Sequence, residues 1–346
     1  MNILLDDLPY NESLFPFGTT RSIARNRIGI LSVLEKWEFY FPGKVAIASE
    51  KPVSKNDLSS FIKFSANVIP SHDFLKKLFL EKKEIPFTPD CKIIAYPWQL
   101  FENNDWAIRQ DFEMLTYGKK SESISESNQV VCPENIFIEA GAIVNFSVLN
   151  AKNGPIFIGK NAEIMEGCLL RGPIAIGANS VLKMGTKMYG ATTIGPHCII
   201  GGEIKNSIVT GFSNKAHDGY LGDSVIGEWC NLGAGTSNSN LKNNASFVKV
   251  WNKESLSFVS AGKKCGLLMG DYSRSAINTS FNTGTVVGVC CNVFGKSFPP
   301  KFIDSFTWGN EKYTFDKAVA DIDNWKQLKG YKMTGEEIQS LKNRYQ

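Results

Sequence analysis

The sequence predicts an α+β protein, in which a small N-terminal α/β domain precedes a left-handed parallel β-helix of hexapeptide repeats and C-terminal helices. An aliphatic residue recurs every six positions, eight times without a break, and glycine directly follows four of these residues. A period of six fits neither an amphipathic helix nor an alternating strand, and it is typical of a triangular β-helix. Short apolar runs and helical spacing indicate the flanking parts. The eight positions are Ile158, Ile164, Leu170, Ile176, Leu182, Met188, Ile194 and Ile200.

The composition is that of an ordinary globular protein with room for about two domains. The chain has 346 residues, a net charge of +4 and eight cysteines. So small a charge does not indicate a nucleic-acid or membrane partner, and no apolar run reaches the ~20 residues of a membrane helix. Acidic residues near the start disfavour a signal peptide. The cysteines form no CxxC pair, so we expect free thiols, no structural metal and a cytoplasmic location.

Residues 1–128 are predicted to form the N-terminal domain. Helical spacing in Asp73–Leu80 predicts one helix, and a second is expected to begin near Asn103. The polar, serine-rich run at 119–128 indicates a linker. Three apolar runs predict short strands, at residues 3–5, 44–48 and 92–95.

The β-helix is predicted to occupy residues 129–312, and its period is interrupted twice. The first break covers Glu203–Gly219 and the second covers about Thr236–Lys264. We expect both to be inserted loops on one face, which in repeat proteins is often the binding face. Residues 313–346 return to helical spacing, and Thr334–Glu337 is a capping box that opens a last helix. This tail is predicted to cover the open end of the β-helix.

The first break contains the residue best suited to proton transfer, His217, beside Asp218. Histidine is the side chain whose charge changes between about pH 5 and 8, so it suits removal of a proton from an amine or hydroxyl group. An exposed loop histidine is the other interpretation, and the residues alone leave both open. His197 lies on a regular corner of the repeat, where we expect a structural role.

The segment KAHDGYLGD at 215–223, followed by NLGAGT at 231–236, resembles a known family. It is similar to the acetyltransferase half of the bifunctional N-acetylglucosamine-1-phosphate uridylyltransferase/glucosamine-1-phosphate acetyltransferase. The resemblance implies that His217 is the catalytic base and that Asn240 orients the acyl acceptor. The sugar contacts that it implies are Tyr220 and Asn231, together with Lys205, which aligns only across a gap.

The same resemblance implies acetyl-CoA as the co-substrate and a homotrimer with sites between neighbouring prisms. The backbone of Ala234 would meet the thioester, and the glycine-rich turn that includes Gly235 would leave the approach open. Lys263 and Arg274 are candidate contacts for the phosphates of coenzyme A. The chain lacks one glycine just before His217 and has Asp218–Gly219 in place of an apolar-threonine pair, so the acceptor stays open.

Residues 14–37 resemble the N-terminus of a bacterial family of two-part proteins that join a sugar nucleotidyltransferase domain to a hexapeptide β-helix. The usual glycine-rich phosphate loop is reduced to Gly18 and the residues TTR that follow it. Asp6 and Asp7 could hold Mg²⁺. A helix with a solvated basic face is the alternative to nucleotide binding. The candidate nucleotide-binding cations are Arg21, Arg25, Arg27 and Lys36.

Three functions follow from these observations. The leading hypothesis is an acyltransferase that moves an acetyl group to an amino sugar linked to a phosphate or nucleotide. The second is a sugar-1-phosphate nucleotidyltransferase in which the β-helix is an oligomerisation scaffold. The third is a non-catalytic protein for sugar-nucleotide binding or assembly. A small sugar phosphate or sugar nucleotide is the expected partner in all three cases.

Overall fold

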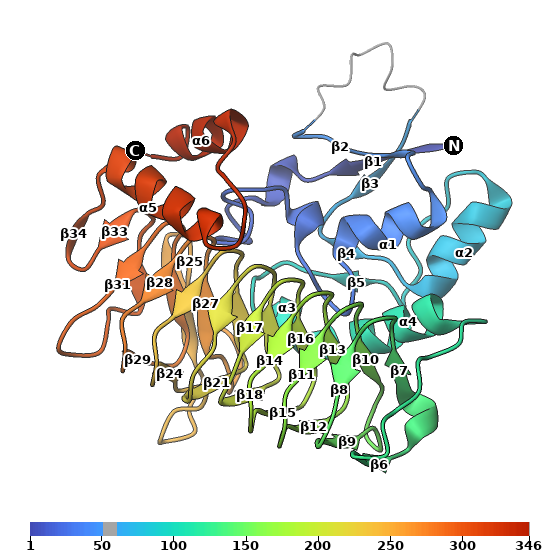
Figure 1. The fold of residues 1–346 in the computed structure, drawn as a ribbon. Helices are drawn as coiled ribbons and strands as arrows, with labels where there is room; N and C mark the ends of the chain where they lie inside the picture. The colour runs from blue at the N-terminus through green and yellow to red at the C-terminus, as the bar shows by residue number, and fades with distance from the viewer. Residues whose placement is uncertain (51–60, 346) are drawn as a thin grey trace.

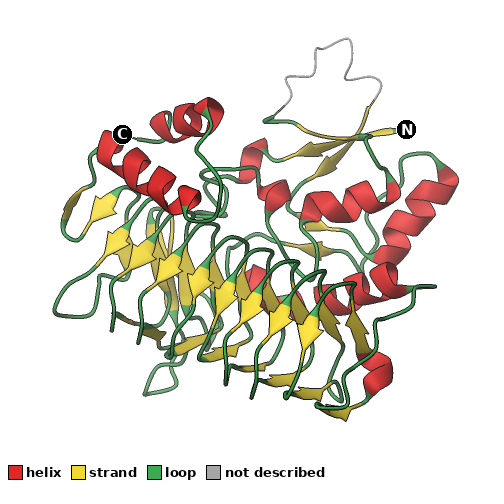
Figure 2. Cartoon of the chain, viewed as in Figure 1, coloured by secondary structure: helices red, strands yellow, loops and turns green. Residues whose placement is uncertain are grey.

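The structure is a computed structural model that describes residues 1–50 and 61–345. A long triangular prism runs through the molecule, the N-terminal region lies along one side of it, and the C-terminal helices lie over its last coils (Figure 1). The prism consists of short strands and loops, whereas the helices lie outside it (Figure 2). The β-helix predicted from the six-residue period is therefore confirmed, together with the flanking N-terminal and C-terminal parts.

The prism has three faces, which we number in chain order, and each coil before the last two contributes one strand to each face. The strands within each face are parallel, apart from the hairpin that ends the second face. The first face contains β7 (Ile136–Ile138), β10 (Ile156–Ile158), β13 (Ile174–Ile176), β16 (Thr192–Ile194), β19 (Ile208–Val209), β22 (Val225–Ile226), β27 (Leu267–Met269), β30 (Thr285–Val287) and β32 (Phe302–Ile303). The second face contains β8 (Ile143–Val144), β11 (Glu163–Ile164), β14 (Val181–Leu182), β17 (Ile199–Ile200), β20 (Asn214–Lys215), β23 (Asn231–Leu232), β28 (Arg274–Ser275), β31 (Asn292–Val293), β33 (Thr307–Trp308) and β34 (Glu311–Lys312). The third face contains β6 (Gln129–Val131), β9 (Val148–Asn150), β12 (Leu169–Arg171), β15 (Lys187–Tyr189), β18 (Glu203–Lys205) and β21 (Tyr220–Gly222), and the pair β24 (Ser237–Asn238) and β29 (Ser280–Phe281) follows.

The prediction that Glu203–Gly219 is an inserted loop is wrong. These residues form β18, β19 and β20, which continue the prism without interruption. The inward side chains go on at residues 200, 204, 209, 215, 221, 226 and 232, so the spacing becomes four, five, six, six, five and six residues. The corner between β17 and β18 has two residues instead of four, and β19 and β22 have two residues instead of the three of β16, so the six-residue period is lost although the coil is kept.

The second predicted break is a real insertion. After β24 the chain leaves the prism at about residue 239 and returns at β27. The loop carries an antiparallel hairpin, formed by β25 (Lys249–Asn252) and β26 (Ser257–Ser260). Val248 and Val250 of this loop are fully buried in the same apolar cluster as the N-terminal core. The insertion therefore packs back onto the molecule.

The N-terminal region is a small α/β unit, as the sequence predicted, and its core surrounds Trp37. Strand β1 (Asn2–Asp6) lies between β2 (Val45–Ile47) and β3 (Phe61–Ser65), parallel to both. Phe64 and Phe74 contact the fully buried ring of Trp37. The other elements are β4 (Val68–Ile69), β5 (Lys92–Ile93), α1 (Val33–Tyr40), α2 (His72–Glu81), α3 (Gln99–Glu102), α4 (Asn104–Thr116) and the 3₁₀ turns η1 (Leu8–Tyr10) and η2 (Ile23–Arg25), whereas a third 3₁₀ turn, η4 (Pro133–Asn135), lies between β6 and β7 of the prism.

This unit covers the first face of the prism. Outward residues of that face are apolar, and Phe137 and Phe157 pack with Ile108 of α4. Such residues would be exposed in an isolated prism, and their burial is favourable at about 25 cal/mol per Å². Asn104 adds a polar connection, because its side chain accepts the Gly29 N–H at 2.7 Å and donates to a main-chain oxygen of the prism at 2.9 Å. The third face and the part of the second face that the C-terminal tail does not contact are left for other contacts.

The C-terminal tail packs along the corner between the first and second faces, rather than across the open end as predicted. In eight coils this corner contains a residue with a left-handed backbone, with φ between 54° and 62°. Rings of neighbouring coils stack, with centroids 4.8 Å apart for His197 and Phe212 and 4.4 Å apart for Phe212 and Trp229. The tail helices α5 (Phe315–Gln327) and α6 (Gly335–Lys342) cover the later part of this column. The eight residues are Asn161, Asn179, His197, Phe212, Trp229, Tyr272, Cys290 and Phe306.

The predicted capping box of the last helix is present, because Thr334 and Glu337 exchange side-chain and main-chain hydrogen bonds. We propose that the boundaries predicted at 128 and 312 separate three structural units. Strand β6 begins at Gln129 and helix α5 begins at Phe315, which supports this division.

Candidate functional site

The third face brings Lys205 and Tyr220 together on neighbouring strands. Strands β18 and β21 are paired in parallel, with Glu203 opposite Tyr220 and Lys205 opposite Gly222. Both side chains are partly exposed, since their positions point out of the prism. The ammonium group of Lys205 lies 5.7 Å from the ring centroid of Tyr189 on the preceding coil. This face therefore presents a cation and two phenol rings to solvent.

Tyr220 is held in one orientation by its neighbours. A Cβ atom added at Gly222 would lie 2.2 Å from the Tyr220 hydroxyl oxygen, so only glycine leaves room for this ring. Asn240 donates its side-chain N–H to the same oxygen at 3.1 Å. Burial, and then the nearby Asp223, raise the pKa of Tyr220 to about 12. The phenol is therefore a neutral hydrogen-bonding group near neutral pH.

Asp223 connects the coils and was not singled out in the sequence. Its carboxylate accepts hydrogen bonds from Asn206 at 2.6 Å and from Asn240. The side-chain amide nitrogen of Asn240 donates to both Asp223 and Tyr220, so these two residues fix the orientation of the Asn240 side chain. Tyr189 and Glu203 were also missed, and they form a 2.6 Å hydrogen bond beside Lys205. These residues could be identified from the sequence only if the register between neighbouring coils were known. The shortened corner between β17 and β18 shifts that register.

His217 lies on the corner between the second and third faces, three residues before Tyr220. Its side chain is exposed. The next coil places the corner of Gly233–Gly235 against it, since the Gly235 N–H donates to the Asp218 carbonyl at 3.0 Å. The structure therefore brings His217, Ala234 and Gly235 to neighbouring corners of the prism.

Asn231 lies on a different face from Tyr220. It is on β23, where its register partners are Asn214 and Arg274. The second and third faces meet at the corner that carries His217, so the predicted residues surround one edge of the prism but do not converge on one cleft within a single chain.

The two predicted coenzyme A cations differ in exposure. Lys263 is exposed near the end of the inserted loop. Arg274 is 7% exposed, because α5 covers it: its guanidinium carbon lies 5.4 Å from the Trp325 ring centroid and it donates to the Asp321 carbonyl. Burial lowers the pKa of Arg274. The guanidinium group of Arg274 is thus covered by α5, and its role in phosphate binding stays a prediction.

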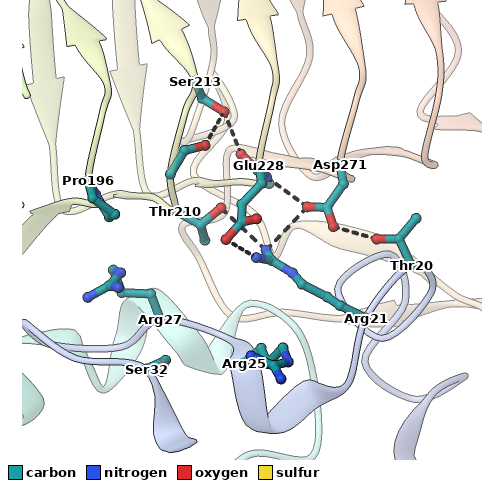
Figure 3. A network of polar contacts seen from close by, with 12 residues as sticks. Thr20, Arg21, Arg25, Arg27, Ser32, Pro196, Thr210, Ser213, Glu228 and Asp271 are labelled. Carbon is teal, nitrogen blue, oxygen red and sulfur yellow. Dashed lines mark hydrogen bonds and ion pairs between the residues drawn. The ribbon is translucent and has the colours of Figure 1, made fainter. Parts of the chain in front are cut away.

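The predicted nucleotide-binding cations are engaged by carboxylates of the protein. Arg21 reaches from the N-terminal region to the prism, where it contacts Glu228 and, at 3.2 Å, Asp271 (Figure 3). The other three cations have partners within the N-terminal region. These pairs are Arg25 with Glu50, Arg27 with Glu35, and Lys36 with Asp111. Each of these cations therefore has a carboxylate partner in the structure, and phosphate binding by them stays a prediction.

A cavity of about 760 Å³ lies beside Arg21. Four carboxylates line it together with three arginines, so it offers no excess of positive charge to a polyphosphate. The charged lining residues are Asp7, Glu50, Glu336, Glu337, Arg21, Arg25 and Arg344.

The predicted Mg²⁺ ligands do not fit a metal site. Both carboxylate oxygens of Asp7 accept hydrogen bonds from Ser49, and Asp6 forms an ion pair with Lys63 at 2.7 Å. In residues 1–50 and 61–345 no three histidine, cysteine or acidic side chains lie close enough to share a metal.

Comparisons with known proteins bear on both parts of the chain. Residues 47–120 match the model of a family described as sugar nucleotidyl transferase. Bifunctional protein GlmU of Methanocaldococcus jannaschii is 36% identical over 106 residues, which cover 31% of this chain and 26% of the relative. A bifunctional sugar-1-phosphate nucleotidylyltransferase/acetyltransferase of Sulfurisphaera tokodaii is 28% identical over 201 residues, which cover 58% of this chain and 44% of the relative. Bifunctional protein GlmU of Methanococcus aeolicus is 38% identical over 86 residues, which cover 25% and 20% of the two chains.

These matches confirm the predicted relationship to bifunctional nucleotidyltransferase/acetyltransferase proteins. The chain spans less than half the length of each of these curated relatives. Among the described residues, every helix is too short or too polar to cross a bilayer.

Proposed function

We propose that the protein transfers an acetyl group from acetyl-CoA to the amine of a sugar that carries a phosphate or a nucleotide. One observation carries the proposal: Tyr220 and Asn240 are hydrogen-bonded to each other on the face that begins at the corner of His217. A polar, oriented pair beside an exposed imidazole suits recognition of a sugar next to a base. The acetyltransferase activity in the names of the relatives supports the same reaction.

In this reaction His217 is the general base. It takes a proton from the substrate amine as the nitrogen attacks the thioester carbonyl carbon, and a tetrahedral intermediate forms. The carbon–sulfur bond then breaks, and the imidazolium returns the proton to the leaving thiolate of coenzyme A. Asn240, fixed by Asp223, orients the acceptor.

The corner after β23 would receive the thioester. The main-chain N–H groups of Gly233 and Gly235 donate to carbonyls of the prism, at 3.1 and 3.0 Å. We therefore assign the oxyanion contact to the N–H of Ala234, which lies between them, and give Gly235 the role of leaving space for the pantetheine chain.

Lys205 is assigned to the phosphate of the acceptor, because it shares the third face with Tyr220. Lys263 is assigned to a phosphate of coenzyme A, because it is exposed at the end of the inserted loop, next to the bridge between Leu241 and Lys264. Asn231, on the second face, would complete a site between neighbouring prisms of a homotrimer, which is the proposed assembly. The eight cysteines are unpaired, which supports a reducing, cytoplasmic environment.

The test is acetyl transfer by the wild-type protein and by two variants. Acetyl-CoA is mixed with a set of amino-sugar phosphates, and the acetylated product is measured by mass spectrometry, since thiol reagents would also titrate the eight cysteines. His217→Ala should lower kcat by about 10²–10⁴-fold, the usual contribution of a general base. Glu166→Ala is the matched control, because Glu166 is exposed at the equivalent corner position three coils earlier. Equal activity of the two variants would exclude His217 as the base.

A sugar-1-phosphate nucleotidyltransferase is the second candidate, and the family match over 47–120 favours it. In that case the β-helix would be an oligomerisation scaffold. The ion pairs of Arg21 and Lys36 argue against it. Release of pyrophosphate from a sugar 1-phosphate and UTP or dTTP with Mg²⁺ would support this candidate. Absence of both reactions would favour the third hypothesis, a non-catalytic sugar-nucleotide binding or assembly protein.

A further inference from the structure

A lysine occupies an inward position of the prism. Lys215 is on β20 in register with Ile200 of the preceding coil, and both side chains are buried, with Lys215 3% exposed. The next coil has Leu232 at the equivalent position of the second face. Burial of an ammonium group among such aliphatic neighbours is costly unless it is hydrogen-bonded, so its contacts indicate what it is for.

The contacts of Lys215 are two main-chain carbonyls of neighbouring corners. Its ammonium group donates to the carbonyl of Gly201 at 3.2 Å and to the carbonyl of His217. Gly201 begins the corner between the second and third faces in the preceding coil, and His217 lies in the same corner of the lysine's own coil. One side chain inside the prism thus connects the corner that carries the proposed base to the corner before it.

Other corners between these faces satisfy the carbonyl of their first residue, which is the equivalent of the Gly201 carbonyl, with a short side chain. Each of these corners has four residues, and the side chain of the fourth residue carries a hydroxyl or thiol group. This group donates to the carbonyl of the first residue, either in its own corner or in the corresponding corner of the next coil. The bonds are Cys168 and Thr186 to the Lys183 carbonyl, at 3.3 and 2.6 Å, and Thr236 and Thr279 to the Ala276 carbonyl, at 3.2 and 2.8 Å.

The corners at Gly201 and His217 lack this donor. Only Gly201 and Gly202 separate β17 from β18, so the corner has no fourth residue. The corner 216–219 has four residues, but the fourth is Gly219, which has no side chain. A Cβ atom at Gly219 would lie 2.1 Å from the Thr236 carbonyl oxygen of the next coil, so a larger residue does not fit there. The lysine therefore supplies from inside the prism the donor for the Gly201 carbonyl, and it adds a bond to the carbonyl of His217, the second residue of its corner.

The geometry points to Lys215 as a positioning residue for acetyl transfer: its bond to the His217 carbonyl fixes the peptide of His217 and therefore the direction in which the imidazole leaves the corner. This role rests on the proposed function of His217. Lys215 itself does not touch substrate, because its ammonium group is enclosed by the prism. Burial lowers the pKa of this lysine to about 8, and Asp218 partly opposes the shift.

Lys215→Met tests the role, with Leu232→Met as the matched control at the same position of the next coil. We expect K215M to lower kcat by about 100-fold, the usual cost of displacing a catalytic group by about 1 Å, with the KM for acetyl-CoA little changed. Its melting temperature should be equal to or above that of the wild type, since a buried charge is replaced by an apolar chain of similar length. L232M should keep the wild-type kcat.

Hydrogen–deuterium exchange gives a readout independent of activity. In K215M, peptides that contain the corner 216–219 should exchange severalfold faster, while peptides that contain the ordinary corner 183–186 keep the wild-type rate. Unchanged exchange at 216–219 would overturn the positioning role, whatever the activity. A fall in kcat that only follows a lower melting temperature would also overturn it, since the lysine would then be structural. If the wild type transfers no acetyl group, the proposed function fails, and the exchange result still decides whether Lys215 holds the corner.

Discussion

Replacement of Arg21 by alanine is predicted to loosen the N-terminal unit from the prism. The guanidinium group contacts Glu228 and Asp271, which lie in two successive coils, and Thr20 donates a further hydrogen bond to Asp271 (Figure 3). The side chains are 11% exposed for Arg21, 34% for Glu228 and 5% for Asp271. Arg21→Ala therefore leaves a buried carboxylate without its cation, next to a second carboxylate.

The size of the effect follows from this burial. Removal of one partner from a buried ion pair costs about 3–5 kcal/mol. The lower end applies here, because Glu228 is one-third exposed and Asp271 keeps hydrogen bonds from Thr20 and from the Glu228 N–H at 2.7 Å. We expect a loss of about 3 kcal/mol in the free energy of unfolding. Arg25→Ala is the control, because the side chains of Arg25 and Glu50 are 46% and 37% exposed and a surface pair contributes about 0–1 kcal/mol.

The assay is urea unfolding followed by tryptophan fluorescence. The midpoint should fall markedly for R21A and hardly at all for R25A, and the free-energy difference is the shift in midpoint multiplied by the slope m. Equal midpoints for the two variants would refute the reasoning, because the contact between the two units would then be no stronger than a surface ion pair.

Three further outcomes are expected. Gly222→Ala should displace Tyr220 and raise the KM for the amino sugar about tenfold, with the KM for acetyl-CoA unchanged. Steady-state kinetics with both substrates varied would measure the two constants, and an equal rise in both would contradict a role of Tyr220 in binding the sugar. Lys36→Met should cost about 3–5 kcal/mol in urea unfolding, since Asp111 is 3% exposed, and a loss below 1 kcal/mol would contradict the burial argument. Burial lowers the pKa of Lys215 from 10.5 in the unfolded chain to about 8 in the folded chain. Between these pH values Lys215 is protonated more often in the unfolded chain, so its contribution to stability should rise with pH in that window. The melting temperature of K215M relative to the wild type should therefore fall between pH 7 and 9.5, and a constant difference would argue against a buried, charged lysine.

The six-residue period predicts the prism because it depends on one side chain per strand, and it fails where the corners change length. From Ile200 to Ile204 the corner loses two residues, and the strands that follow are displaced from the expected phase. Lys215 hides the pattern further, since a lysine at an inward position does not count as apolar. Continuity of the coil at 203–219 could therefore not be derived from the spacing of aliphatic residues.

The candidate site is predictable where its residues are neighbours in the sequence. His217 and Tyr220 lie three residues apart and share one motif. The role of Asp223 depends on Asn206 and Asn240, each 17 residues away, and therefore on the stacking of coils. The partners of Arg21 are Glu228 and Asp271, which are 207 and 250 residues away, so these ion pairs could not be derived from the local sequence.

Thermal stabilisation by ligands is the most direct test of where the chemistry lies. The purified protein is heated with acetyl-CoA, and separately with UTP or dTTP and Mg²⁺. We expect acetyl-CoA to raise the melting temperature, since a ligand that binds only the folded state at 100 times its Kd stabilises by about 2.7 kcal/mol, and we expect the nucleotides to have no effect. Stabilisation by a nucleotide alone would contradict acetyl transfer at His217 and move the working site to the N-terminal unit.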